Sequence, residues 1–126
     1  MRILGLGTDI VSIPRIAKMV NRHGNRFMNR CFQPDEIQYA TSRGLGLAAS
    51  LAGRWAAKEA FLKALGGEIA HIPYHEVTVL RTESGQPQLL VTNSAAQALT
   101  ARGGRHLHVS ISHEREYAVA TVVIED

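Results

Sequence analysis

The sequence has little or none of several features that define common classes of protein. Its single cysteine, Cys31, excludes an internal disulfide, and no cysteine pair is present for a zinc site. No run of about 18 apolar residues marks a membrane span. Met1 and Arg2 lead directly into a short apolar run that glycines interrupt, which is too short for a signal peptide. We therefore expect a cytoplasmic protein with no membrane partner.

Acidic residues are missing from the stretch 10–34, although the net charge of the whole chain is only +3. Basicity that is local in this way favours a surface for an acidic partner. On a helix over 13–23 and its continuation, four basic residues and one methionine share a face: Arg15, Lys18, Met19, Arg22 and Arg26. A solvated helix face is the alternative that spacing leaves open, and Gly24 can end the helix before Arg26.

The chain of 126 residues is the size of one domain with its own core, so we expect a single domain over 1–126. Helices fall mainly in the first half and strands in the second, which favours an α+β fold. We expect a small antiparallel sheet packed on one long helix, with shorter helices around it. Periodicity and turn signals predict a strand at 3–11, helices at 13–23, 34–42 and 47–65, a hairpin of 76–83 and 87–92, a helix at 94–102, and strands at 106–112 and 117–124.

Charged side chains interrupt the long helix, which is otherwise rich in alanine and leucine. Glu59 and Lys63 project from the same side as a row of small residues that permits close approach of another backbone. Buried charge must be paired or must await a ligand, because leaving it alone costs several kcal/mol. A simple ion pair between Glu59 and Lys63, four residues apart, is the plainest interpretation and is worth about 0.2–0.5 kcal/mol.

Asp9, a lone acid at the end of the first strand, adds a second interpretation. If it faces the long helix, its carboxylate and that of Glu59 converge and need a cation between them. Magnesium is the natural candidate, since it takes one or two carboxylates and completes its shell with water and phosphate oxygens. Lys58 and Lys63 would then suit the remaining phosphate charge.

Three other motifs are weaker. Gly5 and Gly7 lack the third glycine of a dinucleotide-binding turn. His106 and His108 lie on one face of a strand without the other ligands of a zinc site. Ser112 and His113 are neighbours on a strand and point to opposite faces, so they do not form a hydrolytic pair. His113 sits where its strand enters a turn and either borders a pocket or belongs to the core.

Several segments together carry a resemblance to a known family. They are Gly7-Thr8-Asp9-Ile10, Ala52-Gly53-Arg54-Trp55-Ala56-Ala57-Lys58-Glu59-Ala60-Phe61-Leu62-Lys63-Ala64, Gly85-Gln86-Pro87, Val109-Ser110-Ile111-Ser112-His113 and Tyr117-Ala118-Val119-Ala120. In order and spacing the chain resembles the holo-acyl-carrier-protein synthases, which are short-form 4′-phosphopantetheinyl transferases. The resemblance covers nearly all 126 residues.

The resemblance implies transfer of phosphopantetheine from coenzyme A to a serine of apo acyl carrier protein, with release of adenosine 3′,5′-bisphosphate, in support of fatty acid biosynthesis. It implies that Asp9 and Glu59 hold magnesium and that Lys63 stabilises charge at the phosphoryl group. It also implies that Arg54, Lys58 and His113 contact coenzyme A, His113 from a neighbouring subunit. The general base stays open between Glu59, a metal-bound water and a carrier carboxylate; Glu59 acting with a water is favoured.

The family resemblance also implies partners. Acyl carrier proteins are small and acidic, and the docking positions fall on Arg15, Met19, Arg22 and Arg26. A homotrimer with active sites between subunits is implied as well. One departure from the family pattern is Gly66-Gly67-Glu68, where Glu68 would repel a phosphate. The rival class is a basic module that binds RNA or an acidic protein without catalysis; it leaves Glu59 without a role, and we expect no nucleic acid.

Overall fold

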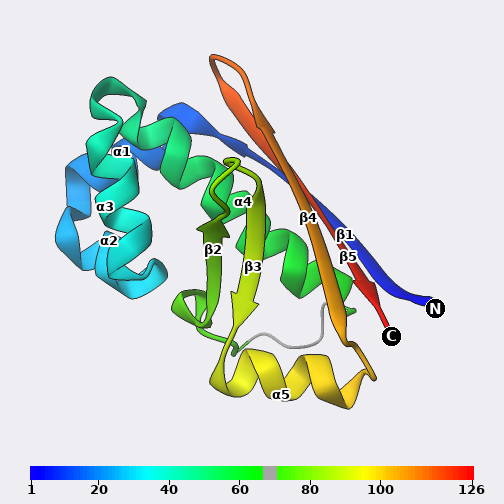
Figure 1. Ribbon diagram of the computed structural model, residues 1–126. Helices are drawn as coiled ribbons and strands as arrows, with labels where there is room; N and C mark the ends of the chain where they lie inside the picture. The colour runs from blue at the N-terminus through cyan, green and yellow to red at the C-terminus, as the bar shows by residue number, and fades with distance from the viewer. Residues whose placement is uncertain (67–70) are drawn as a thin grey trace.

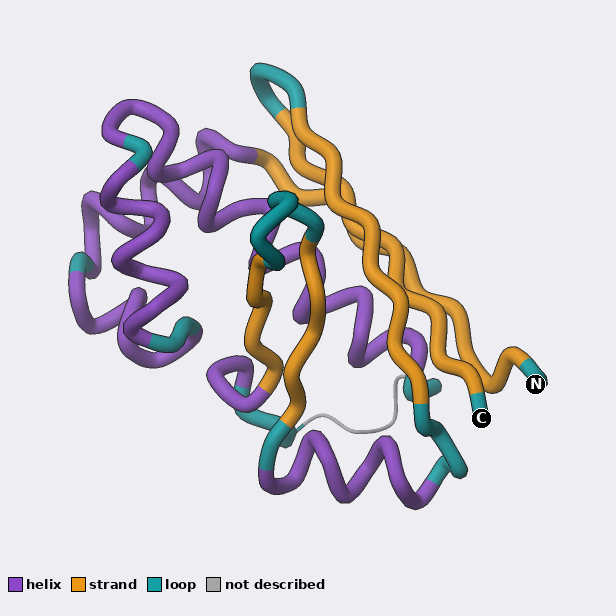
Figure 2. The backbone as a smooth tube through the Cα atoms, viewed as in Figure 1, coloured by secondary structure: helices purple, strands orange, loops and turns teal. Residues whose placement is uncertain are grey.

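The computed structural model describes residues 1–66 and 71–126 as an α+β fold (Figures 1 and 2). The Gly66-Gly67-Glu68 departure therefore lies mostly outside the described residues. In chain order the elements are β1 (Ile3–Ser12), α1 (Ile13–His23), α2 (Asn25–Cys31), α3 (Pro34–Ser42), the 3₁₀ turn η1 (Gly44–Gly46), α4 (Leu47–Ala64), the 3₁₀ turn η2 (Tyr74–Glu76), β2 (Val77–Arg81), β3 (Pro87–Val91), α5 (Asn93–Ala101), β4 (His106–His113) and β5 (Tyr117–Glu125).

Two antiparallel sheets flank α4. The larger has the order β1-β5-β4, and the smaller is the β2-β3 hairpin. Figure 1 shows the three long strands along one side of the molecule, with both chain ends at the same end of that sheet. The single small sheet expected from the sequence is thus divided in two, because β2 pairs only with β3 within the described chain. Helix α4 packs against strands of both sheets.

The contact between β1 and α4 depends on two glycines. A Cβ atom added at Gly7 would lie 2.0 Å from the carbonyl oxygen of Ala60, and one at Gly5 would lie 2.0 Å from that of Ala64. Only glycine permits so close an approach of strand to helix. Because side chains alternate along a strand, Asp9 continues the face that Gly5 and Gly7 turn toward α4.

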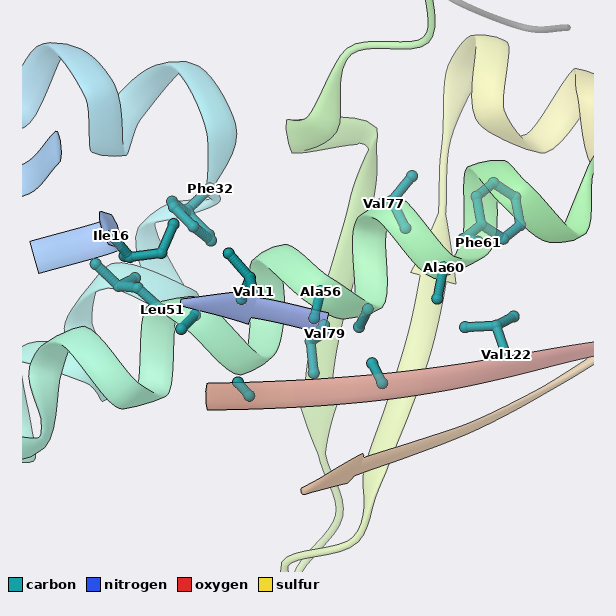
Figure 3. Packing of buried hydrophobic residues seen from close by; sticks show 14 of the residues in the cluster. Val11, Ile16, Phe32, Leu51, Ala56, Ala60, Phe61, Val77, Val79 and Val122 are labelled. Carbon is teal, nitrogen blue, oxygen red and sulfur yellow. The ribbon is translucent and has the colours of Figure 1, made fainter. Parts of the chain in front are cut away.

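The core surrounds α4, which packs against the sheets on one side and against the N-terminal helices on another (Figure 3). Small side chains on α4, among them Ala56 and Ala60, have no exposed surface and belong to the same buried cluster as Val122 of β5 and Val79 of β2. Phe61, also fully buried, fills the space near the end of the helix. The packing fixes the rotation of α4 about its axis, and so decides which of its charged side chains reach the surface.

The basic helix of the N-terminal region is interrupted. Gly24 has a φ of 53°, and its N–H donates to the carbonyl of Val20, which ends α1. A second helix, α2, begins at the next residue and was not predicted. The prediction that Arg26 shares one continuous helix face with Arg15 and Arg22 is therefore wrong, since Arg26 belongs to α2. The possibility that Gly24 ends the helix is confirmed.

Within the described parts of the chain, every helix is too short or too polar to cross a bilayer.

Candidate active site

Asp9 and Lys63 form an ion pair where β1 crosses α4. The Lys63 ammonium lies 3.1 Å from Asp9 Oδ1 and donates to the carbonyl of Thr8 at 3.1 Å. The Asp9 side chain is 14% exposed and that of Lys63 is 52% exposed, so the pair opens to solvent on the lysine side. An anion approaching from solvent would meet a cation that already has one carboxylate partner.

Glu59 lies one helical turn before Lys63 and accepts a hydrogen bond from the hydroxyl of Tyr74. Burial raises the pKa of the Tyr74 phenol, and the hydrogen bond to Glu59 together with the negative charges of Glu59 and Asp9 raises it further. Both carboxylates therefore act on the same phenol. Among the described residues Lys63 pairs with Asp9 and not with Glu59, so the simple helical ion pair is not formed.

The donor set at this place suits a hard divalent cation that is shared with a ligand. In the described residues, 1–66 and 71–126, no cluster of three or more histidine, cysteine, aspartate or glutamate side chains exists to enclose a metal. Two carboxylates, Asp9 and Glu59, are available. Mg²⁺ commonly takes one or two protein carboxylates and fills its remaining positions with water and phosphate oxygens, so the residues present fit this ion.

Lys58 is fully buried, and this contradicts its predicted contact with a phosphate. Its ammonium lies 2.9 Å from Glu36 Oε1 and also donates to the carbonyls of Tyr74, at 3.2 Å, and Val77. Burial lowers the pKa of Lys58, while the Glu36 carboxylate raises it. All three donors of the ammonium have acceptors, so Lys58 has neither surface nor a free proton to offer a ligand.

A second polar region is a cleft of about 330 Å³ between α3, α4 and the ends of β2 and β4. Three guanidinium groups surround the ring of Tyr39 there, with Cζ atoms 4.6 Å (Arg54), 4.9 Å (Arg81) and 5.9 Å (Arg43) from its centroid. His113 lines the same cleft, so the structure brings Arg54 and His113 together within one chain.

Arg54 is only partly satisfied in that cleft. One of its terminal nitrogens donates to Ser50 Oγ at 3.0 Å, but its buried Nε has no partner among the described residues. Burial lowers the pKa of the guanidinium, Glu36 raises it, and Arg81 lowers it. Three guanidinium groups that line one cleft favour an anionic ligand, such as a phosphate monoester.

One of the predicted docking residues, Met19, opens onto a groove of about 630 Å³. Arg15 and Arg22 on α1 and Arg26 on α2 are exposed, and half-buried Met19 lines the groove. Aromatic side chains that were not predicted to bind anything supply its apolar wall, namely Phe27, Trp55 and Tyr74. They come from α2, α4 and η2 and meet only in the folded chain, so no local sequence pattern indicates that they lie together.

The chain is similar to known proteins over nearly its whole length. Residues 5–122 match the model of the 4′-phosphopantetheinyl transferase superfamily. A protein of Koribacter versatilis named holo-(acyl-carrier-protein) synthase is 43% identical over 125 residues, 98% of this chain and 99% of its own length. The chain belongs to the 4′-phosphopantetheinyl transferase superfamily.

Solved structures share the fold. The holo-(acyl-carrier-protein) synthase of Neisseria meningitidis superimposes with a TM-score of 0.89 at 32% identity, covering 99% of this chain and all of that one. The Helicobacter pylori synthase, solved in complex with coenzyme A, gives a TM-score of 0.83 at 30% identity and covers 95% and 99% of the two chains. The expected α+β class and the family resemblance are thereby confirmed.

Proposed function

We propose that this chain transfers the 4′-phosphopantetheine group of coenzyme A to a serine hydroxyl of apo acyl carrier protein. The products are holo acyl carrier protein and adenosine 3′,5′-bisphosphate, and the reaction supplies fatty acid biosynthesis in the cytoplasm. The observation that carries the proposal is the ion pair of Asp9 and Lys63 one helical turn from Glu59, in a member of this superfamily. The transferase domain spans 1–126.

Asp9 and Glu59 would hold Mg²⁺. When bound, the ion neutralises the diphosphate of coenzyme A and acts as a Lewis acid toward the phosphorus under attack. Lys63, half exposed beside Asp9, would bind the same diphosphate and neutralise the charge that develops on the transferring group and on the leaving oxygen. Preorganised charge of this kind supplies most of the catalysis in phosphoryl transfer.

In the bond-making step the serine oxygen attacks the phosphorus that carries pantetheine. The bond from that phosphorus to the bridging oxygen breaks, and the electron pair leaves with adenosine bisphosphate. The serine proton passes to a water held by Glu59, whose second carboxylate oxygen is not used by Tyr74. Glu59 acting directly and a carboxylate of the carrier are the other acceptors for that proton.

The cleft around Tyr39 suits the nucleotide end of coenzyme A. Arg54 and His113 would contact its phosphates, with Arg43 and Arg81 adding positive charge. Gly85 and Pro87 lie at the rim of the same cleft, where a flat base could rest on backbone. The coenzyme A complex of the Helicobacter pylori relative supports a ligand of this kind in this fold.

The carrier protein would dock on Arg15, Met19, Arg22 and Arg26. The exposed arginines match an acidic partner, and Met19 opens onto the apolar groove beside Tyr74, so that a docked helix would lie next to Glu59. Charges at the edge of such a contact mainly speed encounter and select the partner.

A homotrimer with active sites at subunit interfaces completes the proposal. The outer face of the larger sheet exposes apolar side chains: Leu6 by 66%, Ile10 by 65%, Tyr117 by 47% and Val119 by 38%. Exposed apolar side chains that share one sheet face are typical of a protein interface. His113 already lines the cleft of its own chain, and in the trimer a neighbour's His113 would add to a cleft of this kind. Sedimentation should give three times the mass of the chain.

The direct test mixes purified protein, apo carrier protein, coenzyme A and Mg²⁺, and follows the intact mass of the carrier. We expect a gain of one phosphopantetheine per carrier, absent when the carrier serine is replaced by alanine and strongly reduced with Asp9→Asn. No gain with an authentic carrier would reject the transferase and favour the non-enzymatic binding module.

A further inference from the structure

We propose that Tyr74 is a positioning residue for Glu59, and that the buried pair of Lys58 and Glu36 holds Tyr74 in place for this role. The inference rests on the proposed function, because it concerns the same carboxylate. Lys58, which was predicted to contact a phosphate, and Tyr74, for which the sequence predicted no role, both gain a role in this way.

Glu36 and Lys58 form a buried ion pair that is fully hydrogen-bonded. Glu36 Oε1 accepts from Lys58 Nζ and from the backbone N–H of Gln33, both at 2.9 Å, and Glu36 Oε2 accepts from the N–H of Val79 at 3.0 Å. The side chains of Glu36 and Lys58 have no exposed surface. The pair thus ties α3, α4 and β2 together through bonds that water does not screen.

The buried pair is also connected to η2 through Lys58. The third acceptor of the Lys58 ammonium, besides Glu36 and Val77, is the backbone carbonyl of Tyr74, at 3.2 Å. The ring of Tyr74 packs on that of Trp55, with centroids 4.8 Å apart. Main chain and ring are therefore both fixed by residues of α4, the helix that carries Glu59.

The hydroxyl of Tyr74 donates to Glu59 Oε1. Lys58 and Glu59 are neighbours on α4, and Tyr74 is hydrogen-bonded to both. Its carbonyl accepts from Lys58, and its hydroxyl donates to Glu59. A glutamate that is partly exposed on a helix otherwise has several rotamers. The hydrogen bond leaves Oε2 of a fixed carboxylate to face a cation or a water.

The expected consequence follows from the general behaviour of groups that support metal ligands. Removing a hydrogen-bond partner of a ligating carboxylate typically weakens metal affinity or activity by about 10- to 100-fold. Tyr74→Phe deletes only the hydroxyl and keeps the ring on Trp55 and the backbone carbonyl on Lys58. We expect the variant to fold and to bind a divalent cation about 10- to 100-fold less tightly in the presence of coenzyme A.

The probe is Mn²⁺, and the readout is the electron paramagnetic resonance signal of the free ion in titrations with coenzyme A present and no carrier. Ser94→Ala is the matched control, because Ser94 likewise donates its hydroxyl to a glutamate, Glu76, in another part of the molecule. The control should bind Mn²⁺ as the wild type does. In a Glu59→Gln background, Tyr74→Phe should have little additional effect, since the partner of the hydroxyl has already changed.

Equal Mn²⁺ affinity of the wild type and a folded Tyr74→Phe variant would overturn the inference. So would unchanged affinity with a raised KM for the carrier, which would make Tyr74 only a wall of the groove. Additive effects of Tyr74→Phe and Glu59→Gln would also overturn it, because they would show a general loss of packing. If the wild type binds Mn²⁺ but never modifies the carrier, the proposed function fails, while the positioning of Glu59 is still decided by the titrations.

Discussion

Two lysines five residues apart on the same helix have opposite environments. Lys58 is fully buried and saturated by Glu36 and two backbone carbonyls, whereas Lys63 is half exposed and is bound to Asp9 and one carbonyl. Both are lysine–carboxylate pairs with nitrogen–oxygen distances close to 3 Å, at 2.9 and 3.1 Å. The distance therefore does not distinguish them; burial does.

The difference in burial indicates that the Lys58 pair stabilises the fold, whereas the Lys63 pair is available to a ligand. A buried pair loses hydration on both sides, so breaking it strands a charge in the interior. A pair that opens to solvent contributes little to stability and can exchange partners with an incoming anion. We therefore expect substitutions at the Lys58 pair to affect folding, and substitutions at the Lys63 pair to affect turnover.

The largest effect is expected for Glu36→Leu, which removes the counter-charge of Lys58. It should lower the free energy of unfolding by about 3–5 kcal/mol, because the ammonium is left buried and unpaired. Urea unfolding followed by circular dichroism measures it. The double variant Glu36→Leu with Lys58→Met should recover a large part of the loss. If Glu36→Leu alone lowers the free energy of unfolding by less than about 1 kcal/mol, the Lys58 pair is no more important for stability than the Lys63 pair.

Lys63→Ala should show the reverse pattern. Loss of a charge aimed at the developing negative charge typically lowers kcat by about 10²- to 10³-fold. The free energy of unfolding should change by less than about 1 kcal/mol, since the lost ion pair is half exposed on the lysine side. Carrier mass against time gives kcat, and urea unfolding gives the stability. Turnover within a factor of three of the wild type would remove Lys63 from the reaction.

Arg15→Glu extends the comparison to an exposed cation that is proposed to meet only the carrier. The apparent KM for the carrier should rise about tenfold or more and the KM for coenzyme A should hardly change, since rim charges steer encounter. Arg105→Glu is the matched control, because it makes the same charge change at an exposed position in another part of the molecule. If both variants raise the KM for the carrier alike, net charge and not a docking face is responsible.

The smallest effect is expected at Glu76, a mostly buried carboxylate with neutral partners in place of a lysine. The hydroxyl of Ser94 and the N–H of Ala95 lower the pKa of Glu76 below its usual value. A carboxyl whose pKa is lowered by folding stabilises the protein above its unfolded-state pKa and loses that contribution as the pH falls through the folded-state value.

Glu76→Gln should therefore lower the Tm at neutral pH, and the difference from the wild type should shrink below about pH 4. Thermal unfolding across a pH series measures it. A difference that stays constant with pH would show that the charge of Glu76 plays no part.

Sequence patterns predicted most of the fold because most elements carry their own signals. The helix over 13–23 and the one over 34–42 agree with α1 and α3 to the residue, and Ser12 caps the first through Arg15 N. Helix α2 was missed because Gly24 is a stop signal, and nothing in the periodicity indicates that a new helix starts directly after it.

The candidate site could be predicted only in part. Asp9 could be predicted because it is a lone acid at the end of the first strand, and the small residues of the long helix permit a strand to lie against it. The roles of Lys58 and Tyr74 could not, because each depends on a partner far along the chain: Glu36 lies 22 residues before Lys58, and Tyr74 lies 15 after Glu59. Helical periodicity gives the relative directions of the side chains, but only packing against the rest of the chain decides which side of the helix is buried.

The most direct test of the central claim is a crystal of the protein with coenzyme A and Mn²⁺, measured for the anomalous signal of manganese. We expect one manganese peak bound by carboxylate oxygens of both Asp9 and Glu59, with the diphosphate completing its shell and Lys63 against the same phosphates. A peak that touches only one of the two carboxylates, or a diphosphate bound elsewhere with no metal between them, would contradict it.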